Sequence, residues 1–429
     1  MTLLQKIKDK KHTIGVVGLG YVGLPLACAA TKNSTKVIGF EVHNGLYAQL
    51  NSGKSHVEAV SEQMLKDSLQ NGLELTLDPS RYAECDVILI CVPTPLTTQR
   101  EPDLNPVTKS LEVIEQYAKT GTVVVLESTT YPLTTKQIMK PLLEKNGKKF
   151  FIGFSPERED PGNQNHSTVT IPKIVSGEGE EAAILVQTVY NGIVQKTVCV
   201  SDTATAEATK ILENTFRAVN IGLINEMKMI FDKMGIDIWE VVDAAKTKPF
   251  GYMPFYPGPG LGGHCIPIDP FYLSWKAREF NASTKFIELA GDINHAMPDY
   301  VISRTREAVD TILGKGLKNL NVLVMGMTYK KNIADVRHSP SVEITQKLLE
   351  AGANVSFCDP HVPVFPSIPE LPSFAGKAAS DITDQEWDLI VLTTDHDAFN
   401  YEDMSSYAPV LVDTRNKIKG GKDTGVFKA

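Results

Sequence analysis

The chain has 429 residues, of which 42% are hydrophobic and 22% charged, and its formal net charge is -8. Because one core usually serves about 100–200 residues, this length predicts two or three domains. The acidic balance, without any basic tract, gives no electrostatic support to nucleic-acid binding. Apolar stretches are interrupted by glycines before they reach the ~18 residues of a membrane span, so we expect no membrane partner.

The cysteines are scattered and lack C-x-x-C spacing, which argues against both a zinc site and a disulfide framework. They are Cys28, Cys85, Cys91, Cys199, Cys265 and Cys358. No group of His, Asp and Glu has metal-ligand spacing either, so we predict no metal. Unpaired thiols favour a reducing compartment, the cytoplasm.

The first part of the chain alternates apolar strands with helices, which predicts a parallel sheet with right-handed crossovers. Strands are expected at Thr13–Gly18, Lys36–Phe40, Asp86–Val92 and Thr122–Leu126, with Phe151–Phe154 and Lys173–Ser176 extending the sheet. The first helix is expected at Tyr21–Thr31.

The pattern changes after residue 200. Thr203–Met234 has no turn signal and predicts one long helix, whose apolar residues recur at helical spacing. These residues are Ile211, Thr215, Ala218, Val219, Leu223, Met227 and Ile230. We expect this stripe to be buried between two subunits of a homodimer. Lys246–Pro270 is rich in Gly and Pro and predicts a structured loop, and helices are expected at Thr284–Asn294 and again after Pro298.

A second alternating unit begins at Asn321–Gly326 and continues through Asn354–Cys358, Leu389–Thr393 and Val410–Val412. We therefore predict an α/β fold with two Rossmann-like, doubly wound parallel-sheet domains, 1–200 and 306–429. A helical segment, 201–305, containing the long central helix joins them.

The segment Gly18-Leu19-Gly20-Tyr21-Val22-Gly23 fits G-x-G-x-x-G, between a predicted strand and a predicted helix. These glycines permit a tight turn, close approach of a pyrophosphate and close helix packing. Glu41 ends the next strand and can accept hydrogen bonds from ribose hydroxyls; no Arg beside it would pair with a 2′-phosphate, so NAD is favoured. The alternatives are an empty Rossmann-like turn and, for Glu41, a solvated strand-end acid.

The run Gly262-Gly263-His264-Cys265-Ile266-Pro267-Ile268-Asp269 places a thiol behind paired glycines and a carboxylate four residues later. Alone, it is compatible with a turn that merely contains a cysteine. With a nicotinamide site in the same chain, it suggests oxidation of an alcohol, capture of the aldehyde on sulfur, and a second oxidation.

Several motifs in order make the chain resemble the UDP-glucose/GDP-mannose dehydrogenase family over nearly its whole length. They are Gly18–Pro25, Cys91–Pro95, Glu127–Pro132, Ser155–Arg158, Lys210 with Asn214, Gly262–Asp269, and Tyr329–Lys331 with Arg337. The stretch from Pro257 to Pro270 is most similar to the branch that oxidises UDP-N-acetylglucosamine at its sixth carbon.

The resemblance implies an NAD-binding domain first, a dimerisation and catalytic-loop region next, and a UDP-sugar-binding domain last. It implies a four-electron oxidation of the sugar 6-hydroxymethyl group to a carboxylate, through a thiohemiacetal and a thioester on Cys265, in polysaccharide (capsule or O-antigen) precursor synthesis. UDP-N-acetylmannosamine, UDP-N-acetylgalactosamine and UDP-glucose remain alternative substrates. A two-electron hydroxyacid dehydrogenase, which needs no such cysteine, and a non-catalytic sugar-nucleotide sensor are alternatives of other classes.

Catalytic roles follow from the same resemblance. Lys210 stabilises an oxyanion, with Asn214 one helical turn away on the same face. Glu157 activates water for thioester hydrolysis, with a structural pair to Arg158 as its alternative. Thr129 positions that water. Asp269 orients a water or Lys210, or else caps the helix that follows.

Binding residues are implied as well. The cofactor set is Gly18, Gly20, Tyr21, Val22, Gly23, Glu41, Pro93, Thr94, Ser128, Thr129 and Arg337. The substrate set is Glu157, Arg158, Lys210, Asn214, Tyr256, Gly258, Gly260, Gly262, Gly263, Tyr329 and Lys330.

The chain departs from the family pattern at two positions. Pro161 stands where UDP-glucose members have a second acid, so the proton relay must differ. Leu133 stands where many relatives have glycine, and we expect it to alter a turn near Thr129.

Overall fold

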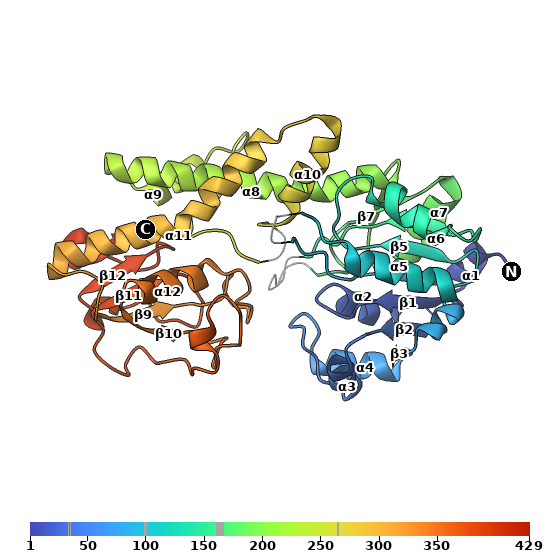
Figure 1. Ribbon diagram of the computed structural model, residues 1–429, viewed down its shortest axis with the longest axis horizontal. Coiled ribbons are helices and arrows are strands. Elements are labelled where there is room, and N and C mark those ends of the chain that lie inside the picture. Colours follow the sequence, from blue (N-terminus) through green and yellow to red (C-terminus); the bar gives the residue numbers. More distant parts are fainter. Residues whose placement is uncertain (33, 35, 98–100, 160–166, 264–265) are drawn as a thin grey trace. The chain divides into compact units, whose positions relative to one another are not determined.

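The computed structural model describes residues 1–429 except 33, 35, 98–100, 160–166 and 264–265 (Figure 1). The chain divides into two compact units. Unit 1 comprises Met1–Glu213 and Phe271–Ser283, and unit 2 comprises Asn214–Pro270 and Thr284–Ala429. Among the described residues, no helix is long and apolar enough to cross a bilayer.

Unit 1 contains an eight-stranded sheet. In spatial order the strands are β3 (Leu73–Thr76), β2 (Lys36–Phe40), β1 (Thr13–Val17), β4 (Val87–Ile90), β5 (Val123–Leu126), β6 (Phe151–Phe154), β7 (Lys173–Gly177) and β8 (Thr197–Cys199). All neighbours are parallel except β6 and β7, which pair antiparallel through Gly153–Gly177 and Phe154–Ser176. The predicted sheet is confirmed, with this one reversed pairing inside it.

The central strands β4 and β5 are apolar throughout because both faces of the sheet are covered there. Ile14 and Val16 point into one core, and Val17 belongs to the other. On the first face lie α1 (Leu3–Lys8), α2 (Gly23–Ala30), α4 (Glu62–Gln70) and α7 (Glu180–Ile193). The second core includes residues of η1 (Pro79–Glu84), α5 (Asn105–Tyr117), η2 (Thr135–Met139) and α6 (Lys140–Leu143). The remaining helix before β3 is α3 (Asn44–Asn51).

The turn from β1 into α2 needs its glycines. Gly18 has φ 84°, in the left-handed region that favours glycine. A Cβ on Gly23 would lie 1.8 Å from the carbonyl oxygen of Gly18, so a side chain there would drive the helix off the strand. A Cβ on Gly20 would meet nothing within 4 Å, which leaves the space in front of the helix N-terminus open.

The long helix and the loop after it were predicted correctly in outline. Helix α8 spans Thr203–Met234 and α9 spans Ile238–Ala245. Helix α10 (Asp269–Ala277) follows the loop and is succeeded by η3 (Arg278–Phe280). The predicted break near Pro298 is wrong, because α11 runs uninterrupted from Lys285 to Leu313. Buried side chains on both sides of this proline, Met297 and Val301 among them, hold the helix together despite one missing N–H donor.

Unit 2 carries a five-stranded, all-parallel sheet. Its order is β10 (Asn354–Cys358), β9 (Asn321–Met325), β11 (Leu389–Leu392), β12 (Val410–Asp413) and β13 (Val426–Lys428). Helix α12 (Pro340–Glu350) and α11 pack against one face of the sheet. Short 3-10 turns, η4 (Pro372–Phe374), η5 (Met404–Ser406) and η6 (Lys422–Thr424), complete the unit. The predicted second Rossmann-like domain is confirmed.

Candidate active site

The described part of the predicted cofactor set in unit 1 lies at the carboxyl ends of parallel strands. Glu41 directly follows β2 and is 7% exposed. Its Oε1 accepts the backbone N–H groups of Val42 at 2.8 Å and His43 at 3.1 Å. Among the described residues, these bonds engage one of its oxygens and fix the carboxylate in place, so Glu41 is a held acid rather than a solvated one. Tyr21 is exposed, with its ring edge against His56.

The ends of β4 and β5 are tied together by side-chain hydroxyls. Thr94 Oγ1 donates to the Thr129 carbonyl at 2.8 Å, and Ser128 Oγ donates to the Val92 carbonyl at 2.7 Å. Tyr272 donates its hydroxyl proton to the Thr94 carbonyl. The structure thus brings Thr94, Ser128 and Thr129 together beside exposed Pro93.

Thr130 is a residue that the sequence interpretation missed. It is fully buried, and among the described residues its hydroxyl has no hydrogen-bond partner. A buried hydroxyl without a partner is costly unless a water or ligand serves it, so Thr130 is as good a candidate for water positioning as Thr129. Its place beside Thr129 in the motif was the only available signal.

These features fit NAD. The open space at Gly20, the close packing at Gly23 and the positive φ of Gly18 allow a pyrophosphate to approach the N-terminus of α2. Within the part of the chain that the structure describes, no hydrogen bond reaches the second carboxylate oxygen of Glu41, which can accept one from a ribose hydroxyl. The residues that would hold the cofactor are therefore the glycine turn, Glu41 and the strand-end loops at Thr94 and Ser128.

Glu157 follows β6 and is held from three directions. Its Oε1 accepts the N–H groups of Arg158 and Glu159, both at 2.7 Å, and its Oε2 lies 2.9 Å from Lys173 Nζ. Burial acts to raise the pKa of Glu157, but the Lys173 ammonium and the two N–H groups outweigh it, so this pKa lies below its ordinary value. Glu157 is therefore a buried carboxylate that stays ionised.

Lys210 on α8 is 7% exposed, and its Nζ donates to the Glu157 carbonyl at 2.5 Å. A solvated lysine would not be held this way. The side chain of Arg158 pairs with Glu213 at 2.6 Å instead of with Glu157, so the structural alternative for Glu157, an Arg158 pair, is wrong. Two residues with predicted catalytic roles, Lys210 and Glu157, are thus in contact in unit 1.

In unit 2, Asn214 and Asp269 form a buried pair. Asn214 Nδ2 donates to Asp269 Oδ2 at 2.5 Å. Asp269 is the first residue of α10, where a carboxylate also stabilises the positive end of the helix dipole. Cys265, the predicted nucleophile, lies outside the described residues, as does Pro161.

The predicted substrate loop of unit 2 depends on close glycine packing. A Cβ on Gly262 would lie 2.4 Å from Tyr329 Cβ, and one on Gly263, which has φ 80°, would lie 2.8 Å from the Tyr329 ring. The N–H of Gly258 donates to Asn225 Oδ1 at 3.1 Å, and a Cβ on Gly258 would lie 2.9 Å from Arg415 Nη1, so the arginine would have to shift.

The other predicted substrate and cofactor residues of unit 2 are also placed. A Cβ on Gly260, which has φ 136°, would approach Pro340 to 3.2 Å. Tyr256 is exposed and donates its hydroxyl to Asp243 at 2.7 Å. Lys330 is half-buried beside Tyr329, and Arg337 is exposed and fixed by Asp335 at 2.7 Å.

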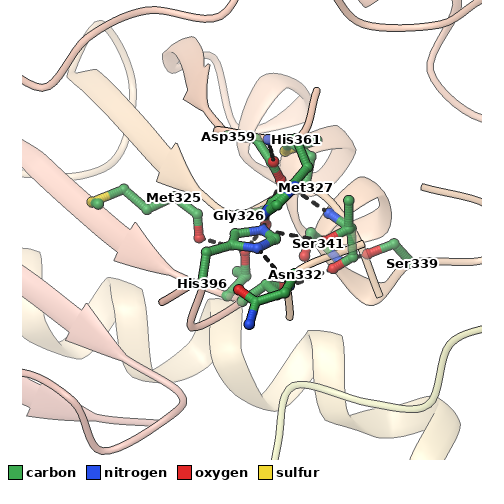
Figure 2. Close-up of polar contacts among 12 residues, drawn as sticks. Met325, Gly326, Met327, Asn332, Ser339, Ser341, Asp359, His361 and His396 are labelled. Carbon is green, nitrogen blue, oxygen red and sulfur yellow. Dashed lines mark hydrogen bonds and ion pairs between the residues drawn. The ribbon is translucent and has the colours of Figure 1, made fainter. Parts of the chain in front are cut away.

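A second strand-end acid, Asp359, follows β10 and has a different use from Glu41 (Figure 2). Its Oδ2 accepts the N–H of Met327 at 2.6 Å, and Oδ1 accepts that of His361 at 2.8 Å. Buried His396 accepts the N–H of Asn332 on Nδ1 at 2.9 Å, so its Nε2 carries the proton and donates to Asp359 Oδ2 at 3.1 Å. The Asp359 carboxylate thus binds a backbone N–H of the loop after β9 and is not left free for a ribose hydroxyl at that atom.

Among the described residues, no group of three or more His, Cys, Asp or Glu side chains is arranged to hold a metal ion. The acidic groups above are instead partnered by lysines, amides and backbone N–H groups, as the Glu157 and Asp359 contacts show.

Family models match the chain in three consecutive segments. These are the NAD binding domain of the UDP-glucose/GDP-mannose dehydrogenase family at residues 12–194, its central domain at 204–296, and its UDP binding domain at 323–420.

Individual relatives agree. A UDP-N-acetyl-D-glucosamine 6-dehydrogenase of Pseudomonas aeruginosa is 39% identical over 83% of this chain and 84% of its own length. A UDP-N-acetyl-D-mannosamine dehydrogenase of Methanococcus maripaludis is 34% identical over 94% and 91%. The solved structure of a UDP-D-ManNAc dehydrogenase from Pyrococcus horikoshii superposes with a TM-score of 0.85 at 30% identity, covering 95% of this chain and 96% of that one. The chain therefore belongs to the UDP-glucose/GDP-mannose dehydrogenase family and is an NAD-dependent oxidoreductase acting on a nucleotide sugar.

Proposed function

We propose that this protein oxidises the 6-hydroxymethyl group of UDP-N-acetylglucosamine to the carboxylate in two successive two-electron steps. The product is UDP-N-acetylglucosaminuronate, a precursor suited to capsule or O-antigen polysaccharides. Support comes from the three family segments and from the 39% identity to a dehydrogenase of that substrate.

NAD, when bound, supplies the hydride acceptor for both oxidations. Cys265 attacks the aldehyde carbon to form a thiohemiacetal, which the second oxidation converts into a thioester. Lys210 stabilises the negative charge on the substrate oxygen, since a desolvated ammonium is most effective where oxyanions develop. Asn214 and Asp269 orient the reacting groups as a hydrogen-bonded pair.

Hydrolysis completes the reaction. Glu157 accepts a proton from the attacking water, which Thr129 or Thr130 positions. The carbon–sulfur bond then breaks and the sulfur leaves as the Cys265 thiolate. For the UDP-sugar, we propose contacts from Arg158, Tyr256, Tyr329, Lys330 and the loop glycines Gly258, Gly260, Gly262 and Gly263. Arg337 contributes to cofactor binding.

One observation carries this proposal furthest: Lys210 donates to the carbonyl of Glu157 at 2.5 Å, while Lys173 holds the carboxylate of the same residue. An ammonium and an ionised acid, both buried, are thereby fixed at one place in the NAD-binding unit. A two-electron hydroxyacid dehydrogenase has no thioester to hydrolyse and would not need this acid. A non-catalytic sensor would need neither group.

The choice of sugar is the open alternative within the same chemistry. The relative from M. maripaludis and the structure from P. horikoshii are named for mannosamine substrates. UDP-N-acetylgalactosamine differs from the proposed substrate only at one hydroxyl. UDP-glucose differs from it only at the acetamido group. Discrimination of this kind depends on a few hydrogen bonds of the loop 246–268.

The test is the amount of NADH formed per mole of limiting UDP-N-acetylglucosamine at exhaustion. Two NADH per sugar support oxidation to the carboxylate, and one NADH would contradict the thioester mechanism. If no NADH forms with this sugar but two NADH form per UDP-N-acetylmannosamine, then UDP-N-acetylmannosamine is the substrate. Replacing Cys265 by Ser is expected to abolish the second oxidation.

We further propose that the protein is a cytoplasmic homodimer whose subunits meet along α8. Large apolar side chains on this helix are exposed in the single chain: Leu212, Phe216, Leu223, Ile230 and Met234. Of the predicted stripe, Ile211 and Ala218 are buried within the chain itself, whereas Leu223 and Ile230 are the part open to a partner. The described cysteines are free thiols, which suits a reducing compartment.

A further inference from the structure

Behind Glu157 lies a buried group of charges that the sequence interpretation did not assign. Glu127 follows β5, Lys173 begins β7, and Tyr190 belongs to α7. Glu127 and Lys173 are 1% and 2% exposed, and Tyr190 is fully buried. Together with Glu157 they form a buried cluster of four side chains from separate segments of unit 1.

Lys173 is the centre of this cluster. Its Nζ lies 2.6 Å from Glu127 Oε2 and 2.9 Å from Glu157 Oε2. The Tyr190 hydroxyl donates to the other oxygen of Glu127, and Nζ lies 5.7 Å from the centroid of the Tyr190 ring. Glu127 and Tyr190 therefore fix the ammonium, and the ammonium in turn fixes Glu157.

The contacts of Glu157 leave one position on its carboxylate open. A carboxylate has about four lone-pair positions. Two on Oε1 are taken by the N–H groups of Arg158 and Glu159, and one on Oε2 by Lys173. Among the described residues, the remaining position is on Oε2, so a water proton delivered to Glu157 arrives at the atom that Lys173 already contacts.

The charges of the cluster keep Glu157 ionised. Two carboxylates and one ammonium carry a net charge of -1, and the Lys173 ammonium lies against Glu157 Oε2. Together with the backbone N–H groups of Arg158 and Glu159, its attraction outweighs the cost of burying the Glu157 carboxylate. A structural ion pair would need only one carboxylate, so the second acid points to a chemical use of the cluster.

The directions in which the pKa values of the cluster are shifted support this arrangement of charges. Burial raises the pKa of Glu127, and the charge of Glu157 adds to that effect, outweighing Lys173 and Tyr190. Burial acts to lower the pKa of Lys173, but Glu127 and Glu157 raise it above its ordinary value. Burial also raises the pKa of neighbouring Cys91, which is therefore a neutral thiol, and the pKa of Glu159.

We propose that Lys173, anchored by Glu127 and Tyr190, is the positioning residue that keeps Glu157 ionised and oriented as the base for thioester hydrolysis. This inference rests on the proposed function. In the step concerned, the water oxygen bonds to the thioester carbon and one water proton passes to Glu157 Oε2. The carbon–sulfur bond breaks with its electron pair on Cys265, and the second proton leaves as the product carboxylic acid ionises.

The test traps the enzyme during turnover with UDP-sugar and NAD, by acid quench and mass spectrometry of the Cys265 peptide. In the Lys173→Met variant, we expect a burst of two NADH per site and an accumulated adduct. The following turnover should be about 10- to 100-fold slower than wild type, a part of the 10²–10⁴-fold that a general base contributes. Lys173→Arg should restore part of this loss.

A second variant keeps the test decisive if Lys173→Met alone fails to fold. Lys173→Met/Glu127→Gln has the same cluster charge as wild type, -1, without an unpaired Glu127. We expect it to fold and still to accumulate the adduct. Wild-type turnover without adduct in this double variant would overturn the proposal, because it would show that Lys173 only balances charge.

The pH profile and a matched control complete the design. Without the ammonium, the pKa of Glu157 rises, so the acidic limb of the hydrolysis rate should move to higher pH. Lys228→Met removes another fully buried lysine, which pairs with Asp232 in unit 2, and should cause no adduct. An unmoved acidic limb contradicts the proposal. A wild-type enzyme that makes no NADH with any UDP-sugar instead contradicts the proposed function on which it rests.

Discussion

The carboxylate of Glu207, fully buried on α8, accepts the backbone N–H of Leu133 at 2.6 Å. Its other oxygen accepts both the N–H and the hydroxyl of Thr135, at 2.8 and 2.7 Å. Leu133 has φ 80°, a conformation that costs a non-glycine residue about 1–2 kcal/mol. One acid from the long helix thus holds a strained turn in the loop after β5, the loop that carries Thr129.

The strain at Leu133 gives a stability prediction. Leu133→Gly removes the left-handed penalty, whereas Leu133→Ala keeps it while losing the same leucine contacts. The glycine variant should therefore be more stable than the alanine variant by about 1 kcal/mol, after allowing for the greater flexibility of unfolded glycine. Scanning calorimetry of both variants measures this difference. An alanine variant as stable as the glycine variant would show that the turn is not strained.

Glu207 should make the stability of the protein pH-dependent near neutrality. Burial raises its pKa to about 7, against the hydrogen bonds from Thr135 and Leu133. The pKa of Glu207 is thus higher in the folded protein than in the unfolded chain, where it is about 4.3. The stabilisation that Glu207 contributes is therefore fully present below the unfolded pKa and is lost as the pH rises to about 7. The difference in unfolding free energy between wild type and Glu207→Gln should change by roughly 2–4 kcal/mol across this window. A difference in unfolding free energy between the two proteins that stays constant from pH 5 to 8 would contradict the raised pKa.

The contact between Gly262 and Tyr329 predicts a loss of catalytic efficiency. A methyl group on Gly262 would lie 2.4 Å from Tyr329 Cβ and 3.0 Å from the His338 carbonyl, so the loop must move. Small displacements near a reacting group can cost about 10²-fold, and we expect kcat/KM of Gly262→Ala to fall by about 10- to 100-fold. Gly316→Ala, where a Cβ meets nothing within 4 Å, is the matched control. Steady-state kinetics on UDP-sugar distinguish the two, and equal kcat/KM values would reject a role for this packing.

The interior strands could be predicted from the sequence because burial on both faces demands continuous apolar runs. Lys36–Phe40 and Phe151–Phe154 were predicted with the bounds that the structure has. The edge strands β8 and β13 were missed for the opposite reason: two of the three residues of β8, Thr197–Cys199, are exposed, and β13 ends in Lys428. The antiparallel pairing of β6 with β7 leaves no mark in either strand's composition.

The site was predictable only where a motif named the residue. Glu157 and Lys210 stand in short motifs, and the structure joins them. Lys173 carries no such signal, because a lysine before an apolar strand is usually a solvated strand end. Its partners Glu127 and Glu157 are 46 and 16 residues away in sequence, so only the fold reveals the contact.

Asp359 should be essential for the stability of unit 2. Replacing it by Asn puts an amide where the carboxylate now accepts the N–H groups of Met327 and His361 and the proton of His396. Losing one of these buried acceptors should cost about 3 kcal/mol. Burial acts to raise the pKa of Asp359, yet His396 and the N–H groups hold this pKa below its ordinary value. Its contribution is therefore present above about pH 4 and lost as pH falls through the folded pKa.

Thermal unfolding at pH 7 checks this prediction, with Asp388→Asn as the control. Asp388 accepts one backbone N–H, that of Asn321, at the opposite end of β9, and is only partly buried. We expect the control to lose less than half as much stability as Asp359→Asn. Equal losses would mean that the His396 contact adds nothing to the backbone bonds.

The exposed apolar residues of α8 give the last prediction, on the oligomeric state. Leu223 and Ile230 lie two helical turns apart on one face and are 53% and 45% exposed. Exposed apolar stripes of this kind are usually covered by a partner, and a twofold dimer would place each stripe against its copy. Leu223→Glu/Ile230→Glu should therefore convert a dimer into a monomer at micromolar concentration, since it buries four carboxylates in one interface. Val364→Glu, an equally exposed apolar position off this helix, should leave the mass unchanged. Sedimentation velocity measures both, and a wild-type protein that is already monomeric would reject the α8 dimer.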